Sequence, residues 1–327
     1  MILILTNDGD VSADLVIDWL NNYNHPFIRI HSSDFIDGNF LLDTESDVIS
    51  FGNKSFAISE IGAVWFRKFG FFNYTNLYEE MSKSMDYRSL FHLTKEFSLI
   101  LGAFISRFSE KKWFTNPKKV QLNKFEVNLI AKKNGLNIPK TFLVNSKEKL
   151  TYLKKLLKSD VISKSILDPL FVFEEEYCYG HYTQVVTDDF INKLSDKFLP
   201  SLIQEKIEKK YELRVFYIEG KCYSMAIFSQ NDALTKIDFR KYNHENSNRY
   251  VPYILPKEIE YKLDLLMKEI GLNNGSIDLI KSTDDDYVFL EINPTGQFGM
   301  TDFPCNYGLH KLVAETLIKY DKNETVH

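Results

Sequence analysis

Residues 275–299, GSIDLIKSTDDDYVFLEINPTGQFG, constrain the fold most, because they predict a β-hairpin with aligned acidic side chains. Apolar residues recur on both sides of an Asp-rich turn, at Ile277, Leu279, Val288, Leu290 and Ile292. A turn centred on Asp284 and Asp285 places Asp278 opposite Glu291. The stretch therefore predicts two carboxylates facing each other across a strand pair.

Two opposed carboxylates destabilise a sheet unless something stands between them. Asn293 lies two residues beyond Glu291, so its amide oxygen shares the face of the carboxylates. An all-oxygen ligand set without His or Cys favours Mg²⁺ over zinc. From this hairpin alone, an acidic strand end exposed to water remains the alternative.

Length and charge limit the remaining possibilities. A chain of 327 residues has room for two or three domains. Its formal net charge of −5 and the lack of a long basic run do not favour nucleic-acid binding. The start, MILILTNDGD, lacks the features of a signal peptide, and no apolar run of about 18 residues predicts a membrane span. Three widely spaced cysteines form no metal motif, which fits a cytoplasmic protein.

The N-terminal third predicts a small α/β domain. Residues 1–5 and 27–30 read as strands on either side of a helix capped by Ser12, which is a βαβ unit without a GxGxxG fingerprint. A further strand, AVWFRK, ends in Arg67 and Lys68, which either meet an anion or are solvated. Residues 79–108 predict one long helix or a broken pair. Its predicted core positions are Leu90, Leu93, Phe97, Ile100, Leu101 and Phe104.

The middle third contains two lysines on separate elements. Residues 118–134 predict an amphipathic helix that carries Lys124 and turns Leu129 inward. Lys164 lies in a short strand, DVISKS, where lysine is uncommon. Each lysine taken alone is best read as a surface residue. Residues 170–190 suggest a hairpin with the acidic run 174–176.

The last third predicts consecutive strands before the opening hairpin. Glu212 and Arg214 are two residues apart on one strand, so both side chains face the same way. Arg240 lies in the loop that follows the next strand, and residues 256–271 predict a helix ending at Gly271.

Roughly residues 116–300 resemble the ATP-grasp ligases in the order of their motifs. These are two lysines, a Q-E-x-x-E hinge, an E-x-R strand and a D…E-x-N hairpin. The VWFRK strand resembles the stretch that precedes the ligase core in graspetide synthetases, the microviridin-type peptide ligases. The ending INPTGQFGMTDFPCNYGLHKLVAE is most similar to the branch of grasp-with-spasm peptide maturases.

This resemblance implies an α/β (α+β) protein with the ATP-grasp fold in three domains. Residues 1–115 would form the N-terminal βαβ-type pre-ATP-grasp domain. Residues 116–203 would form the central lid, and residues 204–327 the C-terminal antiparallel-sheet domain with the metal site.

The resemblance also implies a role for each site residue. Lys124 and Lys164 would contact the ATP phosphates. The backbone of Lys206 and Ile207 would hold adenine beside Glu205, and Glu208 would bind the ribose. Arg214 and Arg240 would meet the terminal phosphate and the acyl-phosphate. The predicted Mg²⁺ ligands are Asp278, Glu291 and Asn293.

One departure concerns the lid. Many ATP-grasp proteins follow the second lysine with a glycine-rich loop, but here KSILDPLFVFEEE contains no glycine and the next one is Gly180. Graspetide synthetases also tend to lack that loop, so the departure agrees with this branch.

The implied activity is ATP-dependent ligation. An Asp or Glu side chain of a ribosomal precursor peptide would be activated as an acyl-phosphate, and a Thr, Ser or Lys side chain would then close an ester or amide ring. The peptide's leader and core are the expected partners, and a homodimer is expected. The acidic run 174–176 is either a contact for a basic leader peptide or a solvated charge run at a loop. The alternatives are a ligase that adds free amino acids and a nucleotide-binding protein without catalysis.

Overall fold

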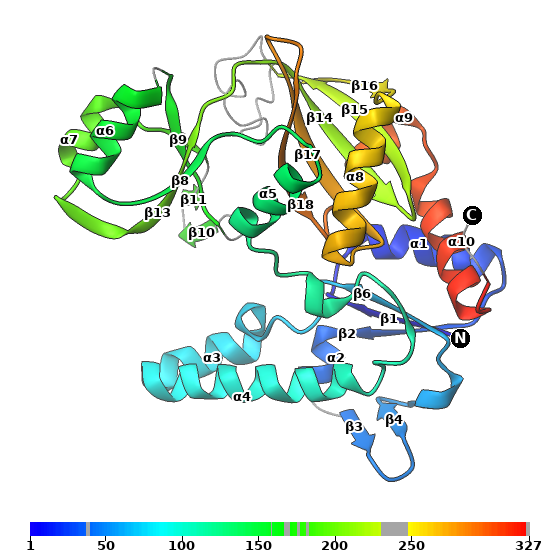
Figure 1. Cartoon of the computed structure of the whole chain (residues 1–327). Coiled ribbons are helices and arrows are strands. Elements are labelled where there is room, and N and C mark those ends of the chain that lie inside the picture. The colour runs from blue at the N-terminus through cyan, green and yellow to red at the C-terminus, as the bar shows by residue number, and fades with distance from the viewer. Residues whose placement is uncertain are drawn as a thin grey trace. The chain divides into compact units, whose positions relative to one another are not determined.

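The computed structural model describes residues 1–36, 40–157, 159–166, 171–174, 177–180, 183–229 and 248–324. The chain forms two compact units (Figure 1). Unit 1 contains residues 1–120, 272–274 and 294–327, and unit 2 contains residues 121–271 and 275–293. The chain therefore returns twice to the unit in which it begins.

Unit 1 is built on a parallel sheet with the strand order β2-β1-β6-β7. Its strands are β1 (Ile2–Thr6), β2 (Phe27–His31), β6 (Ala63–Arg67) and β7 (Lys112–Phe114). Helix α1 (Val11–Asn22) connects β1 to β2, so the predicted βαβ unit is present. The predicted cap Ser12 is wrong, because Asp10 caps α1 by accepting a hydrogen bond from the Ala13 N–H while Ser12 is buried in the first turn.

The remaining N-terminal elements of unit 1 surround an aromatic core. They are α2 (Ser32–Ile36), β3 (Phe40–Asp43), β4 (Val48–Phe51), β5 (Lys54–Ala57), η1 (Ile58–Glu60), η2 (Phe72–Tyr74), α3 (Asn76–Ser84), α4 (Tyr87–Ser106) and η3 (Pro117–Lys119). The predicted long helix is thus a broken pair, with Asp86 capping α4. Leu90 and Phe104 are buried as expected, but Ile100 is exposed, because only one side of α4 meets the core.

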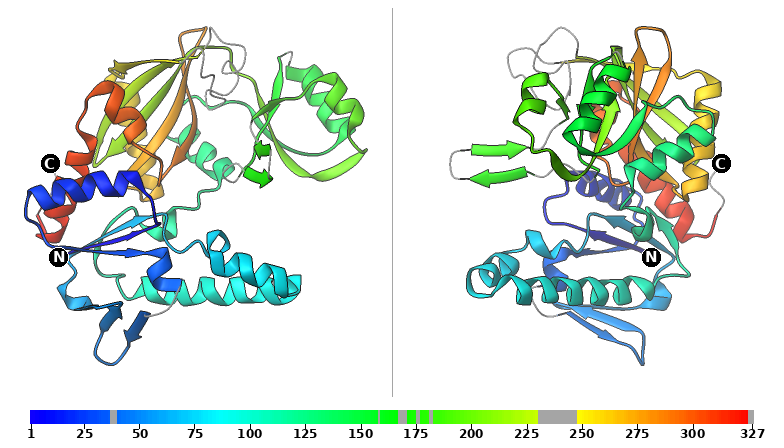
Figure 2. Two further views of the ribbon diagram at one scale, coloured as in Figure 1. Left: turned by 180° about the vertical axis from the view of Figure 1, so that it is seen from behind. Right: turned by 60° about the vertical axis from the view of Figure 1, so that its left-hand side comes forward.

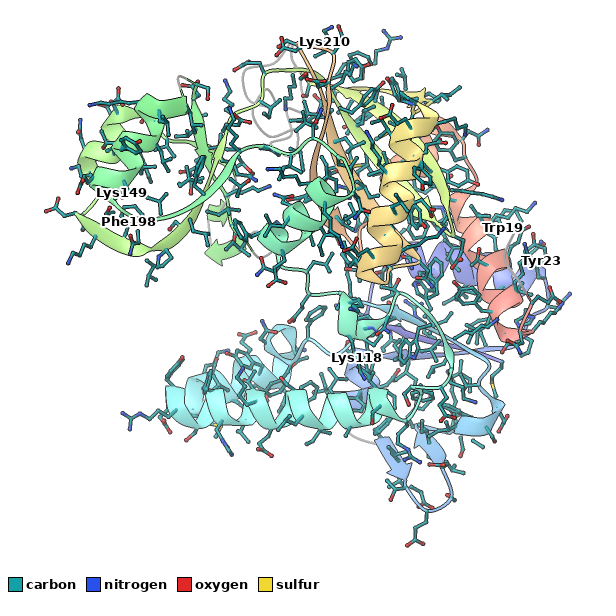
Figure 3. All side chains as sticks on the ribbon, viewed as in Figure 1. Trp19, Tyr23, Lys118, Lys149, Phe198 and Lys210 are labelled. Carbon is teal, nitrogen blue, oxygen red and sulfur yellow. The ribbon has the colours of Figure 1, made fainter. Side chains whose placement is uncertain are left out.

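The last helices of the chain, α9 (Gly299–Cys305) and α10 (Leu309–Asp321), also belong to unit 1. Helix α10 packs against α1, as Figure 1 shows. Trp19 lies on α1 and Tyr23 directly follows that helix, and both are labelled in Figure 3. The Tyr23 hydroxyl donates to Glu315 of α10 over 2.7 Å. The two ends of the described chain are therefore packed into one core.

Unit 2 begins with α5 (Lys124–Lys133) and a sheet of order β12-β9-β13-β8. The strands are β8 (Thr141–Ser146), β9 (Val161–Ser163), β12 (Gln184–Val185) and β13 (Lys197–Glu205). Helices α6 (Lys147–Leu157) and α7 (Asp188–Lys193) complete its small apolar core. The predicted hairpin appears as β10 (Phe171–Glu174) and β11 (Tyr177–Gly180), while residues 175 and 176 of its acidic run lie outside the described residues.

The second sheet of unit 2 has five strands in the order β16-β15-β14-β17-β18. They are β14 (Lys209–Ile218), β15 (Lys221–Phe228), β16 (Arg249–Tyr253), β17 (Asn274–Ser282) and β18 (Tyr287–Asn293). Helix α5 packs on β18 and helix α8 (Lys257–Ile270) on β15 (Figure 2). Among the described residues, no helix combines the length and apolar character that crossing a bilayer requires.

Candidate active site

The hairpin of β17 and β18 has the predicted register at its functional end. Asp278 pairs with Glu291, and Ser276 pairs with Asn293. The turn spans residues 283–286, where Asp285 accepts a hydrogen bond from Lys210, which is labelled in Figure 3. The turn aspartate is thus bound to a lysine at the surface, while Asp278 and Glu291 are partly buried.

A β-bulge at Leu290 interrupts this hairpin. Leu279 pairs with Phe289 rather than with Leu290, so Leu290 is the extra residue on β18. Regular alternation would place Phe289 and Glu291 on one face. The bulge instead lets Phe289 enter the core, where it is fully buried, while Glu291 keeps its place opposite Asp278.

Two lysines from different elements meet at Glu291. The Nζ atoms of Lys124 and Lys164 lie 3.3 Å and 3.7 Å from the same oxygen, Glu291 Oε2. The lysine side chains are only 13% and 10% exposed. The structure therefore brings both predicted phosphate-binding lysines to one predicted metal ligand.

Local structure explains the position of Lys124. The helix begins at Lys124 because Asn123 caps it, accepting hydrogen bonds from the N–H groups of Phe125 and Glu126. The predicted start at residue 118 and the inward-facing Leu129 are wrong. Val127, Asn128 and Ala131 form the buried face, and Leu129 is half exposed.

Arg214 provides the third positive charge of this site. Its Nη1 donates to both oxygens of Asp278, 2.7 Å from each. Lys124, Lys164 and Arg214 with Asp278 and Glu291, hereafter the charge cluster, therefore carry three positive and two negative charges. Such a cluster favours a bound anion, because the carboxylates do not neutralise all of the cations.

Glu212, which precedes Arg214 by two residues on β14, is a site residue without a role predicted from the sequence. The carboxylate is buried and forms an ion pair with Lys209, whose side chain is also buried. The sequence feature that indicates Glu212 is its spacing of two residues from Arg214, which puts both side chains on one face of the strand. A buried carboxylate of this kind persists only when it is paired.

The predicted hinge, residues 205–208, is held by backbone contacts. The Glu205 carboxylate accepts from the Lys140 N–H over 2.9 Å, and the Lys206 N–H donates to the Asp160 carbonyl over 2.8 Å. Lys206 Nζ contacts Glu208 over 2.5 Å, and this hydrogen bond raises the pKa of Lys206. The hinge is therefore a fixed edge rather than a loose linker.

A pocket of about 970 Å³ opens beside this hinge. All four hinge residues line it together with α5, the start of β8 and the β17–β18 turn. Phe125, Leu129 and Phe142 supply apolar surface. No residue of the charge cluster lines this pocket. The predicted nucleotide-binding residues of unit 2 therefore form two groups, the hinge residues at the pocket and the two lysines in the charge cluster.

The oxygen-bearing side chains of the β17–β18 hairpin fit a hard divalent cation. Among the described residues, no three His, Cys, Asp or Glu side chains gather as a ready metal site. Asp278, Glu291 and the Asn293 amide offer three oxygens from two paired strands, and Mg²⁺ commonly completes its shell with phosphates and water. The donor set thus suits Mg²⁺ together with a phosphate ligand.

Two further predicted residues lie elsewhere. Arg240 lies outside the described residues. Arg67 is buried in unit 1, with its Nε 3.0 Å from Asp10, and its Nη1 donates to the carbonyls of Thr295 and Gly296. Burial lowers the pKa of Arg67, although the ion pair with Asp10 opposes the shift. The interpretation of Arg67 as a solvated residue is therefore wrong. The anion that it contacts is the carboxylate of Asp10 in the same chain.

Comparison with known proteins gives structural relatives only. No sequence-family profile matches the chain, and a search of curated proteins finds no match. The structure is similar to a RiPP-associated ATP-grasp ligase of Chryseobacterium gregarium, solved in complex with ADP and a leader and core peptide. The two share 26% sequence identity over 97% of this chain and 96% of the other, with a TM-score of 0.83.

A second relative is the macrocyclase MdnC from Microcystis aeruginosa MRC, solved with its precursor peptide MdnA. It shares 25% identity over 98% of this chain and all (100%) of its own, with a TM-score of 0.82. The ATP-grasp ligase PsnB and D-alanyl-alanine synthetase A of Vibrio cholerae match at TM-scores of 0.77 and 0.57. Their identities of 18% and 15% support the fold alone.

Proposed function

We propose that the chain, which belongs to the ATP-grasp ligases of the graspetide-synthetase type, closes ester or amide rings in a ribosomal precursor peptide. The observation that carries this proposal is the charge cluster. Two lysines and an arginine from three elements converge on the two opposed carboxylates of the β17–β18 hairpin. That arrangement suits a nucleoside triphosphate with its cation. The Chryseobacterium relative was solved with ADP and a leader and core peptide, and MdnC with its precursor peptide.

Each residue of the site has a distinct proposed role. Asp278, Glu291 and Asn293 hold Mg²⁺, which when bound neutralises phosphate charge and polarises the phosphate oxygens. Lys124 and Lys164 bind the ATP phosphates in the places where they now contact Glu291. The backbone of Lys206 and Ile207, beside Glu205, holds adenine, and Glu208 binds the ribose.

The chemistry follows from the poor electrophilicity of a carboxylate. An Asp or Glu side chain of the peptide attacks the terminal phosphorus of ATP, forming an acyl-phosphate and releasing ADP. A hydroxyl or amine of the same peptide then attacks the acyl carbon, and phosphate leaves. Arg214, together with Arg240, stabilises the charge on the transferred phosphate, which is mainly electrostatic catalysis by fixed cations.

The direct test is mass spectrometry of a short peptide encoded beside the ligase gene, incubated with enzyme, ATP and Mg²⁺. Loss of one water mass per ring with matching ADP release is the expected result. Glu291→Gln keeps the size of the side chain but removes a charge and a metal ligand. The peptide incubated with this variant should therefore keep its full mass. Glu269→Gln, at the surface of α8, is the matched control and should retain activity.

The same assay separates the alternatives. ATP turnover that requires free amino acids and adds their mass to an acceptor would replace the macrocyclase with an amino-acid ligase. Absence of ATP turnover with every acceptor, in a folded protein that binds ATP, would leave a non-catalytic nucleotide-binding protein.

A homodimer also belongs to this proposal. Helix α4 exposes apolar side chains, with Phe91 52% and Leu99 70% exposed. Contiguous exposed apolar surface commonly marks a protein interface. Light scattering should give twice the chain mass for the wild type and the monomer mass for Phe91→Glu/Leu99→Glu. An unchanged mass would rule out this face as the interface.

Three narrower expectations remain predictions from the sequence. They are the assignment to the grasp-with-spasm branch, leader binding by residues 174–176, and a cytoplasmic location. The three-domain division at residues 115 and 203 likewise stays a prediction. Charge reversal of residues 174–176 that left leader affinity unchanged would rule out the leader contact.

A further inference from the structure

The topology of unit 1 points to a ligand site away from the charge cluster. Strand β1 pairs in parallel with β2 on one side and β6 on the other. The chain moves from β1 to β2 and only later reaches β6, so the direction of strand succession reverses at β1. In open parallel sheets, ligands bind outside the carboxyl ends of the strands at such a reversal.

A crevice of about 420 Å³ lies at these carboxyl ends. Its walls come from the segments that follow β1, β2 and β6. The polar lining residues are Asn7, Asp8, Ser32, Ser33, Thr75 and Asn76. We call this pocket the switch-point crevice. The proposed function assigns it no role.

Hydrogen bonds fix its walls in place. Ser32 Oγ donates to Asn7 Oδ1 over 2.6 Å and accepts from the Gly70 N–H over 2.9 Å, which ties the ends of three strands together. Ser33 Oγ donates to Asp8 over 3.0 Å. Since Ser32 is buried, this is a built wall rather than a set of surface side chains.

The chemistry of the lining selects the ligand. The lining contains amide, hydroxyl and carboxylate groups, and none of the described residues in it is Lys or Arg. Phe71 adds partly exposed aromatic surface. Such a lining disfavours phosphate or carboxylate ligands, which need cationic partners, and favours hydroxyl or ammonium groups.

We propose that the switch-point crevice binds the core of the precursor peptide through a side chain that bears a hydroxyl or ammonium group. This rests on the proposed function, because such groups are the nucleophiles that the ligation consumes. Asp8 is the recognition residue. Its side chain is 64% exposed, and its Oδ1 accepts a hydrogen bond from Ser33 and lies 3.2 Å from Nδ1 of His31. A carboxylate accepts hydrogen bonds from a hydroxyl and from an ammonium group alike.

The test measures binding without turnover. Fluorescence anisotropy compares binding of the full precursor peptide with binding of the leader alone, in the absence of ATP. The proteins are wild type, Asp8→Asn and the control Asp18→Asn on the exposed side of α1. The full peptide should bind wild type more tightly than the leader does. Asp8→Asn should weaken full-peptide binding about tenfold or more, as expected for a hydrogen bond to a charged group, and leave leader binding unchanged.

Peptide variants separate the two groups. Asp8→Asn should lower the affinity most for a core peptide whose hydroxyl residues are replaced by Lys. It should not change the affinity for a core peptide in which they are replaced by Ala. The proposal would be overturned if wild type bound the full peptide and the leader with equal affinity. It would also be overturned if Asp8→Asn lowered the affinity for both peptides equally. Because no ring is formed in this assay, failure of the macrocyclase activity is a separate result, seen only by mass spectrometry.

Discussion

Arg214 Nη1 lies 2.7 Å from each carboxylate oxygen of Asp278. This contact sets a cation beside the predicted metal ligand, and both side chains are largely buried. Arg214→Gln removes the charge and should lower kcat by about 10²–10³, the usual effect of losing one group that stabilises transition-state charge. Steady-state ADP release measures it. The exposed Arg88→Gln on α4 should behave as wild type, and an active Arg214→Gln enzyme would remove Arg214 from the mechanism.

The lysines at Glu291 should act on the nucleotide. Lys124→Met and Lys164→Met keep much of the side-chain length but remove the charge near Glu291 Oε2. We expect each to weaken ATP binding by about tenfold or more, because a charged hydrogen bond to phosphate is lost. Isothermal titration with a non-hydrolysable ATP analogue measures this. Lys133→Met, at the exposed end of α5, is the control, and equal affinities in all three variants would contradict the assignment.

The β-bulge predicts unequal roles for two adjacent residues. Phe289 is fully buried and Leu290 is the bulged residue. Phe289→Ala should therefore destabilise the protein by about 3–5 kcal/mol, the usual cost of truncating a buried Phe. Leu290→Ala should cost clearly less. Denaturant unfolding followed by near-UV circular dichroism measures both, and a larger loss for Leu290→Ala would indicate the regular register without a bulge.

The buried Asp302 should make unit 1 sensitive to acid. Burial by itself raises the pKa of Asp302, but hydrogen bonds from the His310 side chain and from the Leu309 and His310 N–H groups outweigh it and lower the pKa. The folded state thus favours the ionised form. Its contribution to stability is complete above the unfolded aspartate pKa of about 3.9 and is lost as pH falls through the lower folded value.

Asp302→Asn should therefore be less stable than wild type at pH 6, by roughly 1.5–3 kcal/mol for the lost charged hydrogen bonds. The difference should shrink as pH falls below about 4. Urea midpoints over this range measure it, with Asp18→Asn as the exposed control. A difference that stays constant with pH would show that Asp302 does not titrate in this way.

The sequence predicted the pairing of Asp278 with Glu291 because both residues lie near the same turn, where local pattern decides register. It did not predict the bulge, because three consecutive apolar residues, 288–290, do not show which of them leaves the regular alternation. Tertiary packing makes that choice by burying Phe289.

The convergence of Lys124 and Lys164 on Glu291 could be inferred only through resemblance to a family. The three residues are far apart in sequence, and no local periodicity links a helix start, a strand end and a hairpin. The same limit applies to Asp10. Its capping role is local, but its ion pair with Arg67 depends on the pairing of β1 with β6.

The return of the last helices to unit 1 has a consequence for synthesis on the ribosome. Helix α10 packs on α1, and Asp321 contacts the His25 ring over 2.8 Å and the Gly62 N–H over 3.2 Å. A nascent chain that ends before residue 321 lacks this side of the core, although β1, α1 and β2 have long emerged. Exposed apolar surface on such intermediates invites chaperones or aggregation. The unit that is translated first is therefore completed last.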